Sequence, residues 1–300
     1  MSVATVEEDR SVHIDEAVLD SVRRSGYAVV EGFLGDDELA EARAALFELF
    51  PAPERYFADP EAFADLVRHP FAGLRVGPLP SWALNRIAFH PDLVDAAERF
   101  CATSDLELYK IELWGKYGGS VDYDQEHHRD YGNHSLVVPR TDGSWPQLTT
   151  FTLLSDVTEQ DGPTKVIPRA IGDDIPLVPH HLDAGALREH EVSVTGPAGT
   201  IFLYTTDVLH RGSAIAGDQR SRFALLADYA ARGNPWMGKV SWPGRALHPG
   251  WDELLANATP RERELFGFPP VGHAYWNAQT IRDVAARWPG IDMAPYAPGA

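Results

Sequence analysis

Hydrophobic residues in the first fifty positions recur at helical spacing, and one short β-rich run interrupts them. Residues 15–24 place their apolar side chains on one helical face, and this pattern stops at Gly26. Residues 27–33 are rich in β-branched and aromatic side chains, whereas apolar residues return to helical spacing over residues 36–50. The pattern predicts a helix, a strand and a second helix that pack as one layer.

Prolines break residues 51–100 into loops, with helical patterns at residues 61–67 and 91–100. We assign no chemistry to this stretch, although Trp82 and Arg86 are candidates for the border of a substrate pocket. Residues 1–100 are therefore predicted to form a mixed, largely helical N-terminal layer.

The pattern changes to short β-rich runs after residue 100. Gly, Pro and Asp clusters separate these runs, which span residues 106–116, 148–154, 164–167, 192–195, 200–204 and 222–229. Many short strands at such spacing favour an antiparallel sandwich or barrel over alternating βαβ units. Nucleotide-binding folds lose support because the sequence has no internal repeat and no phosphate-binding glycine motif. Residues 101–230 therefore predict a mainly β core with flanking helices.

The strand pattern fades after residue 230, where the chain becomes rich in Pro and Trp. Residues 261–266 and 279–288 have a helical pattern, and the tryptophans are Trp236, Trp242, Trp251, Trp276 and Trp288. We interpret residues 231–300 as an aromatic-rich extension that forms a lid, an oligomer contact or a packing layer on the barrel. The full chain, residues 1–300, is expected to fold as a single domain.

Composition narrows the class of protein and its partners. Hydrophobic content of 44% and charged content of 23% are ordinary for a globular protein, and the formal net charge is -18. So acidic a chain argues against a nucleic-acid or anionic-membrane partner, because both need a positive surface. With Cys101 as its single cysteine and no apolar run typical of a signal peptide or a membrane span, the chain is expected to be cytoplasmic.

Four His-x-Asp triplets occur in the sequence, and one of them stands out by its context. Side chains two apart in a strand point to the same face, so His128 and Asp130 are expected to project together. Only this triplet is followed, several strands later, by a histidine that heads another strand, His210. Two imidazoles and one carboxylate form the facial triad that binds ferrous iron and leaves positions open for O2 and a cosubstrate. The triplet at His181, by contrast, lies in a stretch with loop composition.

A cationic residue follows His210 on the next predicted strand. Arg222 shares a face with Ala224 and Leu226, so it is expected to point inward, where a guanidinium needs an anionic partner. A dicarboxylate cosubstrate supplies that partner, because the planar fork of Arg binds a carboxylate bidentately. Arg220 has the same parity and remains the alternative, and Ser213 is a candidate to donate its hydroxyl to the same carboxylate.

Over residues 15–230 the sequence resembles the phytanoyl-CoA dioxygenase family of Fe(II)/2-oxoglutarate-dependent oxygenases. The motifs that carry the resemblance are Ser25–Phe33, His128-Arg129-Asp130, Leu154–Pro168, His210 with Gly212-Ser213, and Arg222. The resemblance implies a double-stranded β-helix (jelly-roll or cupin-like) core, with His128, Asp130 and His210 as iron ligands. It also implies that Arg222 binds the distal carboxylate of 2-oxoglutarate.

The chain departs from the family pattern in two places. After Pro168 it reads Arg169-Ala170-Ile171 where many relatives have Gly-Ser-His, and the interval from His210 to Arg222 is one residue longer than usual. The second departure keeps Arg220 open as the anchor for 2-oxoglutarate.

The resemblance implies hydroxylation or a related oxidation, because halogenating relatives lack the carboxylate that Asp130 supplies. Fe(II), 2-oxoglutarate and O2 are the expected cofactor and cosubstrates, and a small or medium apolar molecule is the expected substrate. Coenzyme A thioesters fit an acidic chain less well, since their phosphates need a basic surface. The alternatives are a jelly-roll protein that binds metal without 2-oxoglutarate, for sensing or structure, and a zinc hydrolase with the same triad.

Overall fold

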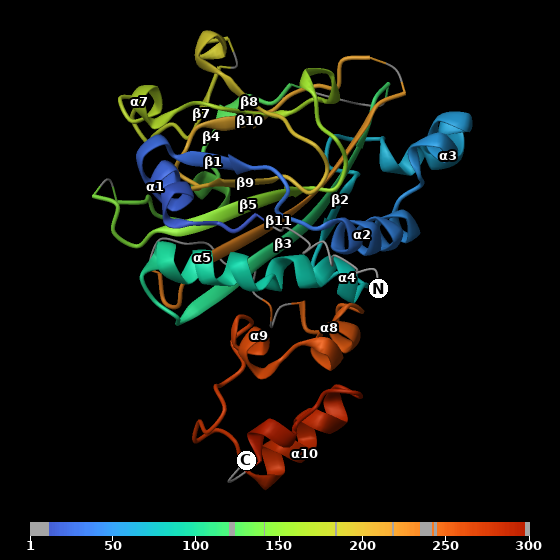
Figure 1. Ribbon diagram of the computed structural model, residues 1–300, viewed down its shortest axis with the longest axis vertical. Coiled ribbons are helices and arrows are strands. Elements are labelled where there is room, and N and C mark those ends of the chain that lie inside the picture. The colour runs from blue at the N-terminus through green and yellow to red at the C-terminus, as the bar shows by residue number, and fades with distance from the viewer. Residues whose placement is uncertain are drawn as a thin grey trace, which may run out of the picture.

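Two antiparallel β-sheets lie face to face in the computed structural model, and helices cover the outer face of the larger sheet (Figure 1). The structure describes residues 12–297 apart from 120–123, 141, 184, 218, 235–241 and 243–244. Tyr123, Trp236 and residues 1–11 lie outside the described residues. The predicted fold class, a mainly β core with flanking helices, is confirmed.

The larger sheet has six strands in the order β1-β9-β5-β11-β3-β2, each antiparallel to its neighbour. Its strands are β1 (Tyr27–Val30), β9 (Ile201–Tyr204), β5 (Gln147–Leu153), β11 (Ser221–Ala231), β3 (Leu106–Tyr117) and β2 (Leu74–Val76). The two longest strands, β3 and β11, pair with each other in this sheet. Their inward side chains supply one wall of the barrel interior.

The smaller sheet has five strands in the order β7-β4-β10-β6-β8, again all antiparallel. Its strands are β7 (His181–Leu182), β4 (His127–His128), β10 (His210–Gly212), β6 (Thr164–Val166) and β8 (Val192–Val194). These strands are short. Several of the polar side chains that face the larger sheet therefore lie on the turns between strands.

Helices lie outside the two sheets and in the C-terminal extension. The α-helices are α1 (Glu16–Ser25), α2 (Asp36–Leu49), α3 (Pro53–Ala58), α4 (Trp82–Asn85), α5 (Pro91–Cys101), α6 (Tyr131–His134), α7 (Arg169–Gly172), α8 (Trp251–Asn257), α9 (Pro260–Glu264) and α10 (Ala278–Arg287). Short 3-10 helices occur at Pro60–Leu66, Arg86–Phe89, Glu159–Asp161, Arg188–His190 and Ala294–Tyr296. None of the helices in the described part of the chain is long and apolar enough to cross a bilayer.

The start of the chain shows how local sequence positions the sheet. Asp15 caps α1 by accepting a hydrogen bond from the Val18 amide, and the helix ends at Gly26 in the left-handed conformation with φ of 88°. A Cβ at Gly26 would lie 2.5 Å from a methyl carbon of Val208. Glycine therefore permits the turn that sends β1 antiparallel to β9.

The main hydrophobic core lies between the larger sheet and the helices packed on it. Leu93, Ala97 and Phe100 of α5 are buried there with residues of β3 and β11. Trp242 and Trp251 of the C-terminal extension join the same core. In Figure 1, α8, α9 and α10 lie below the helical layer, on the far side from β4 and β10. The described part of the extension therefore packs as a further layer on the helices.

The helical stretch predicted at residues 61–67 is present as a 3-10 helix at Pro60–Leu66. Two other local predictions need correction. His181 was assigned to a loop, but it begins β7 and pairs with β4. Asp130 was expected to continue the strand of His128, yet β4 ends at His128 and Asp130 has helical φ and ψ of -59° and -29° before α6. A turn, and not strand alternation, brings its carboxylate beside the imidazole.

Candidate metal centre and cavity

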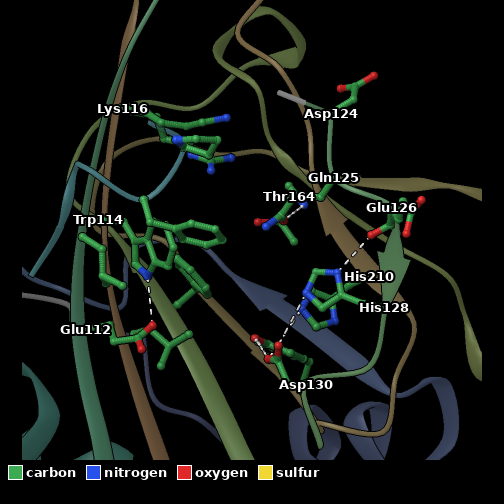
Figure 2. Close-up of a pocket in the computed structure, with 18 of the residues that line it drawn as sticks. Glu112, Trp114, Lys116, Asp124, Gln125, Glu126, His128, Asp130, Thr164 and His210 are labelled. Carbon is green, nitrogen blue, oxygen red and sulfur yellow. Dashed lines mark hydrogen bonds and ion pairs between the residues drawn. The ribbon is translucent and has the colours of Figure 1, made fainter. Parts of the chain in front are cut away.

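His128, Asp130 and His210 converge between the two sheets. They offer ligand atoms that all lie within 4.8 Å of one another, and all three residues are buried. Strand pairing explains the convergence, because His210 of β10 is the direct antiparallel partner of His128 in β4. Asp130 lies to one side of both rings, with Oδ1 3.6 Å from Nε2 of His128 and Oδ2 3.5 Å from Nε2 of His210 (Figure 2).

A backbone carbonyl two residues before each histidine orients its imidazole. Nδ1 of His128 lies 3.0 Å from the Glu126 carbonyl oxygen, and Nδ1 of His210 lies 3.0 Å from the Val208 carbonyl oxygen. A carbonyl oxygen only accepts, so each Nδ1 carries the proton and donates it. Nε2 of each ring therefore points toward Asp130 and is the atom available to a metal, which is the orientation that a metal ligand needs.

Burial and the charge of Asp130 act on the two histidines differently. Burial lowers the pKa of His210 to about 4, against the attraction of Asp130, so this imidazole is neutral at ordinary pH. Burial also opposes the charged form of His128, but its hydrogen bond with Asp130 and the negative charge of Asp130 outweigh that effect and raise its pKa. A neutral imidazole beside a carboxylate suits a divalent cation, since the ion replaces the missing positive charge.

Polar side chains from the larger sheet support the cluster from the opposite side. The Tyr204 hydroxyl of β9 donates a hydrogen bond of 2.9 Å to Oδ2 of Asp130. Burial raises the pKa of Tyr204 well above its usual value, so the hydroxyl remains a donor. Lys110 of β3 pairs with Asp228 of β11 at 3.2 Å, and both side chains are almost fully buried. Burial opposes the charge of Lys110, but Asp228 raises its pKa above the usual value.

A cavity of about 670 Å³ lies beside the cluster and includes it in its lining. The smaller sheet and its turns contribute His128, Asp130, His181 and His210, and the larger sheet contributes the opposite wall. That wall is formed by Lys110, Glu112, Trp114 and Lys116 of β3, Arg222 and Leu226 of β11, Phe151 and Tyr204. No described residue beyond Leu226 lines the cavity. A lid and an oligomer contact both stay predictions.

Arg222 and Leu226 both line this cavity, as expected for two residues on the same face of a strand. Its guanidinium donates a hydrogen bond to the Gly162 carbonyl oxygen, and Lys116 is its register partner on β3. Arg220 does not line the described cavity and pairs with Asp161 at 2.9 Å. The geometry therefore favours Arg222 over Arg220 as the residue that meets a ligand.

Ser213 lies next to this end of the cavity without lining it among the described residues. Its hydroxyl donates to the Pro163 carbonyl oxygen at 2.6 Å, and its own carbonyl oxygen accepts a bond of 3.1 Å from Lys116 Nζ. A hydroxyl contact from Ser213 to a carboxylate stays a prediction.

Sequence patterns missed several residues that line the cavity. Lys110, Glu112, Trp114 and Lys116 alternate along β3, and this period of two was visible in a strand that was predicted correctly. His181 was set aside with its loop assignment, although its ring stacks 5.5 Å from that of His128.

His127, Trp82 and Arg86 lie away from the cavity. His127 precedes His128 in β4 and does not line the described cavity, and its Nε2 lies 3.0 Å from Glu191. Trp82 stacks on Phe89, and Arg86 pairs with Glu41 at 3.0 Å. Neither Trp82 nor Arg86 is among the described residues that line the cavity.

Fold and site together define a class: a double-stranded β-helix protein with two histidines and one carboxylate arranged as a candidate mononuclear metal centre. The chain belongs to the phytanoyl-CoA dioxygenase (PhyH) family, whose model matches residues 22–224. The resemblance that the motifs indicated is therefore confirmed. A comparison with curated proteins finds no match.

Solved structures with the same fold include those of SnoN, EctD and HygX. The epimerase SnoN, in complex with Fe3+, alpha ketoglutarate and nogalamycin RO, is 23% identical; the match covers 72% of this chain and 82% of SnoN, with a TM-score of 0.53. EctD from S. alaskensis, with 2-oxoglutarate and 5-hydroxyectoine, is 20% identical over 74% of this chain and 77% of EctD, with a TM-score of 0.54. HygX from Streptomyces hygroscopicus, with nickel and 2-oxoglutarate bound, is 17% identical over 73% of this chain and 87% of HygX, with a TM-score of 0.53. At these identities the likeness establishes the fold.

Proposed function

We propose that this protein is an Fe(II)- and 2-oxoglutarate-dependent oxygenase that hydroxylates a small molecule. One observation carries the proposal: a single cavity is lined by the His128, Asp130 and His210 cluster and also by Arg222. The first group fits a divalent metal ion, and the second fits a carboxylate. A cosubstrate with an anionic end and a metal-binding end matches both.

The residues present fit an iron ion by their chemistry. Two neutral imidazole nitrogens and one carboxylate form a donor set that suits Fe(II), and three protein ligands leave room for further ligands. Bound there, Fe(II) would supply the electrons for O2 activation coupled to decarboxylation of 2-oxoglutarate. His128, Asp130 and His210 would hold the ion, and the Tyr204 hydroxyl would hold Asp130 in place.

Arg222 and Lys116 make the opposite end of the cavity cationic. They are register partners on β11 and β3, and both line the cavity. The guanidinium of Arg222 would bind the distal carboxylate of 2-oxoglutarate, and this orients the keto acid end toward the histidines. The stoichiometry of the proposed reaction is 2-oxoglutarate, O2 and R-H converted to succinate, CO2 and R-OH.

The proposed outcome is hydroxylation, and product analysis tests it. SnoN, which shares the fold, is an epimerase, so related proteins direct the oxidation to different ends. Asp130 argues against halogenation, because a carboxylate in this position leaves no ligand site for a halide.

A second candidate is a metal-binding jelly-roll protein that needs no 2-oxoglutarate, and a third is a zinc hydrolase. Neither of these candidates explains why Arg222 points inward on the wall of the cavity. A hydrolase would also need no oxygen.

Succinate formation separates these candidates. The purified protein is loaded anaerobically with Fe(II), exposed to 2-oxoglutarate and O2, and assayed for succinate with and without candidate substrates. The proposal predicts slow succinate release without substrate, faster release with one, and none from Asp130→Ala. Succinate formation that is absent under all conditions, or equal in Asp130→Ala, would contradict the proposal.

A further inference from the structure

The inward face of β3 carries charges of both signs along its length, with the anionic Glu112 between the cationic Lys110 and Lys116. Lys110, Glu112, Trp114 and Lys116 all line the cavity, and their register partners on β11 are Asp228, Leu226, Ala224 and Arg222. Lys116 and Arg222 form the cationic end that the proposed cosubstrate would occupy. Glu112 lies four residues from Lys116, which is about 13 Å along a strand. The remainder of the cavity is therefore available to a second molecule next to Glu112.

Glu112 presents a carboxylate that the described residues do not fully engage. Its Oε2 accepts a hydrogen bond of 3.1 Å from Trp114 Nε1 and lies 3.7 Å from Lys110 Nζ. Its Oε1 makes no hydrogen bond with any described residue, and the side chain is 15% exposed. Trp114 and Lys110 thus fix one oxygen and leave the other for a ligand in the cavity.

The charges around Glu112 do not cancel. Lys110 lies between two carboxylates, 3.2 Å from Asp228 and 3.7 Å from Glu112. One ammonium group shared between two carboxylates, and closer to Asp228, leaves Glu112 only partly neutralised. A ligand cation beside Glu112 would complete that neutralisation.

Aromatic and apolar side chains adjoin the carboxylate. The Trp114 ring meets the Phe71 ring edge to face with centroids 5.8 Å apart, and Leu74 lines the same part of the cavity. Phe71 is half exposed, so this wall reaches the mouth. An aromatic surface beside a carboxylate suits an ammonium group on an apolar body, because rings attract cations through their faces.

The carboxylate also lies across the cavity from the candidate metal centre. Figure 2 shows Glu112 and Trp114 on one wall, with Asp130, His128 and His210 on the other. A ligand anchored at Glu112 would therefore extend toward the metal ligands. The acidic chain, with a net charge of -18, would also draw cations to the mouth.

We propose that Glu112 and Trp114 form a substrate subsite for a small amine, with the ammonium group paired to Glu112 and the apolar body packed on Trp114 and Phe71. This inference rests on the proposed function, since it names the substrate class of the same site. It excludes anionic substrates from the Glu112 wall, because a second carboxylate there would add to a negative charge that is only partly neutralised.

Three probes that share a phenyl ring and differ in their polar group test the subsite. The full chain is loaded with Ni(II) and 2-oxoglutarate to prevent turnover, and calorimetry measures the binding of phenethylamine, 2-phenylethanol and 3-phenylpropionate. The wild-type protein is expected to bind phenethylamine at least about tenfold more tightly than 3-phenylpropionate. In Glu112→Gln the amine should lose about tenfold in affinity, while 2-phenylethanol changes less than about threefold.

A matched control is Glu126→Gln, which neutralises another glutamate that lines the cavity but whose side chain is 64% exposed. This change should weaken phenethylamine by less than about threefold, because water screens an exposed charge. Glu112→Asp keeps the charge and withdraws it by one methylene, so it should lose amine affinity while retaining the preference over the carboxylate.

Three results would overturn the subsite: phenethylamine that binds no better than 3-phenylpropionate, an unchanged amine affinity in Glu112→Gln, or an equal loss in Glu126→Gln. Binding of 2-oxoglutarate is measured separately in each variant. A wild-type protein that binds 2-oxoglutarate but shows no preference for the amine refutes the subsite alone. A wild-type protein that prefers the amine but binds no 2-oxoglutarate refutes the proposed function alone.

Discussion

The Tyr204 hydroxyl donates a hydrogen bond of 2.9 Å to Oδ2 of Asp130, and this bond joins the two sheets at the candidate metal centre. Tyr204 ends β9 in the larger sheet, whereas Asp130 follows β4 in the smaller one. Asp130 is held by a turn and not by a strand, so it needs such a partner to keep its orientation. The hydroxyl leaves Oδ1 to face His128, at 3.6 Å from its Nε2.

Removal of this hydroxyl should weaken metal binding. We expect Tyr204→Phe to raise the Kd for Co(II) or Fe(II) by about 10-fold or more, because groups that orient a metal ligand typically contribute 10- to 100-fold. Calorimetric titration of the metal-free protein measures the change. Tyr27→Phe is the matched control, since Tyr27 lies beside Tyr204 in the sheet and its hydroxyl has no hydrogen bond with the described residues. Equal Kd values for Tyr204→Phe and the wild-type protein would contradict this role.

Arg222 and Arg220 should differ sharply in their effect on 2-oxoglutarate. Arg222→Met is expected to raise the KM for 2-oxoglutarate by about 10- to 100-fold, the cost of losing a charged, bidentate hydrogen bond. Arg220→Met should change it by less than about threefold, since Arg220 pairs with Asp161 outside the cavity. Steady-state succinate assays give both values. A larger effect from Arg220→Met would reassign the anchor.

The buried Lys110 and Asp228 pair should be strongly coupled in stability. Lys110→Met leaves the Asp228 carboxylate uncompensated in a buried site, so we expect it to lower the free energy of unfolding by about 3 to 5 kcal/mol. The double variant Lys110→Met/Asp228→Leu should recover most of this loss, because it removes both charges. Urea unfolding of both single variants and the double variant completes the cycle. Additive losses would show that the two residues do not act as a pair.

The stability of the metal-free protein should depend on the protonation of His210. Its pKa is lowered from 6.5 in the free side chain to about 4 by burial, so between these values the folded state binds fewer protons here than the unfolded state. The contribution of neutral His210 is therefore full above pH 6.5 and is lost as the pH falls toward 4, by about 3 kcal/mol.

His210→Gln isolates this effect from the other titrating groups. The difference in unfolding free energy between the wild-type protein and this variant should shift against the wild-type protein as the pH falls through that window. Chemical unfolding at a series of pH values, without metal, measures the difference. A difference that is constant with pH would show that His210 is not held neutral by burial.

The strand pattern of the sequence predicted most of the sheet scaffold. The runs at 106–116, 148–154 and 222–229 correspond to β3, β5 and β11, because long strands with many apolar residues carry a strong periodic signal. The two-residue strands β4 and β7 carry almost none. His181 was therefore placed in a loop, and its position beside His128 emerged only from strand pairing.

The sequence predicted which three residues come together at the site, but the strand geometry assumed for Asp130 was wrong. Motif context brought His128, Asp130 and His210 together, although Asp130 projects from a turn. Tyr204, Lys110 and Glu112 were missed because their contacts cross from one sheet or strand to another, and a single sequence does not show which strands are neighbours. Strand alternation indicates that these side chains point inward, but it does not show which residues they contact.

Anaerobic titration with Fe(II) and 2-oxoglutarate tests the central claim most directly. The wild-type protein should bind one Fe(II) per chain and develop a visible charge-transfer absorption when 2-oxoglutarate is added. His128→Ala should lose the absorption, whereas His181→Ala, which changes a neighbouring histidine outside the candidate ligand cluster, should still bind the metal. A normal absorption in His128→Ala, or none in the wild-type protein, would contradict the assignment of the metal centre.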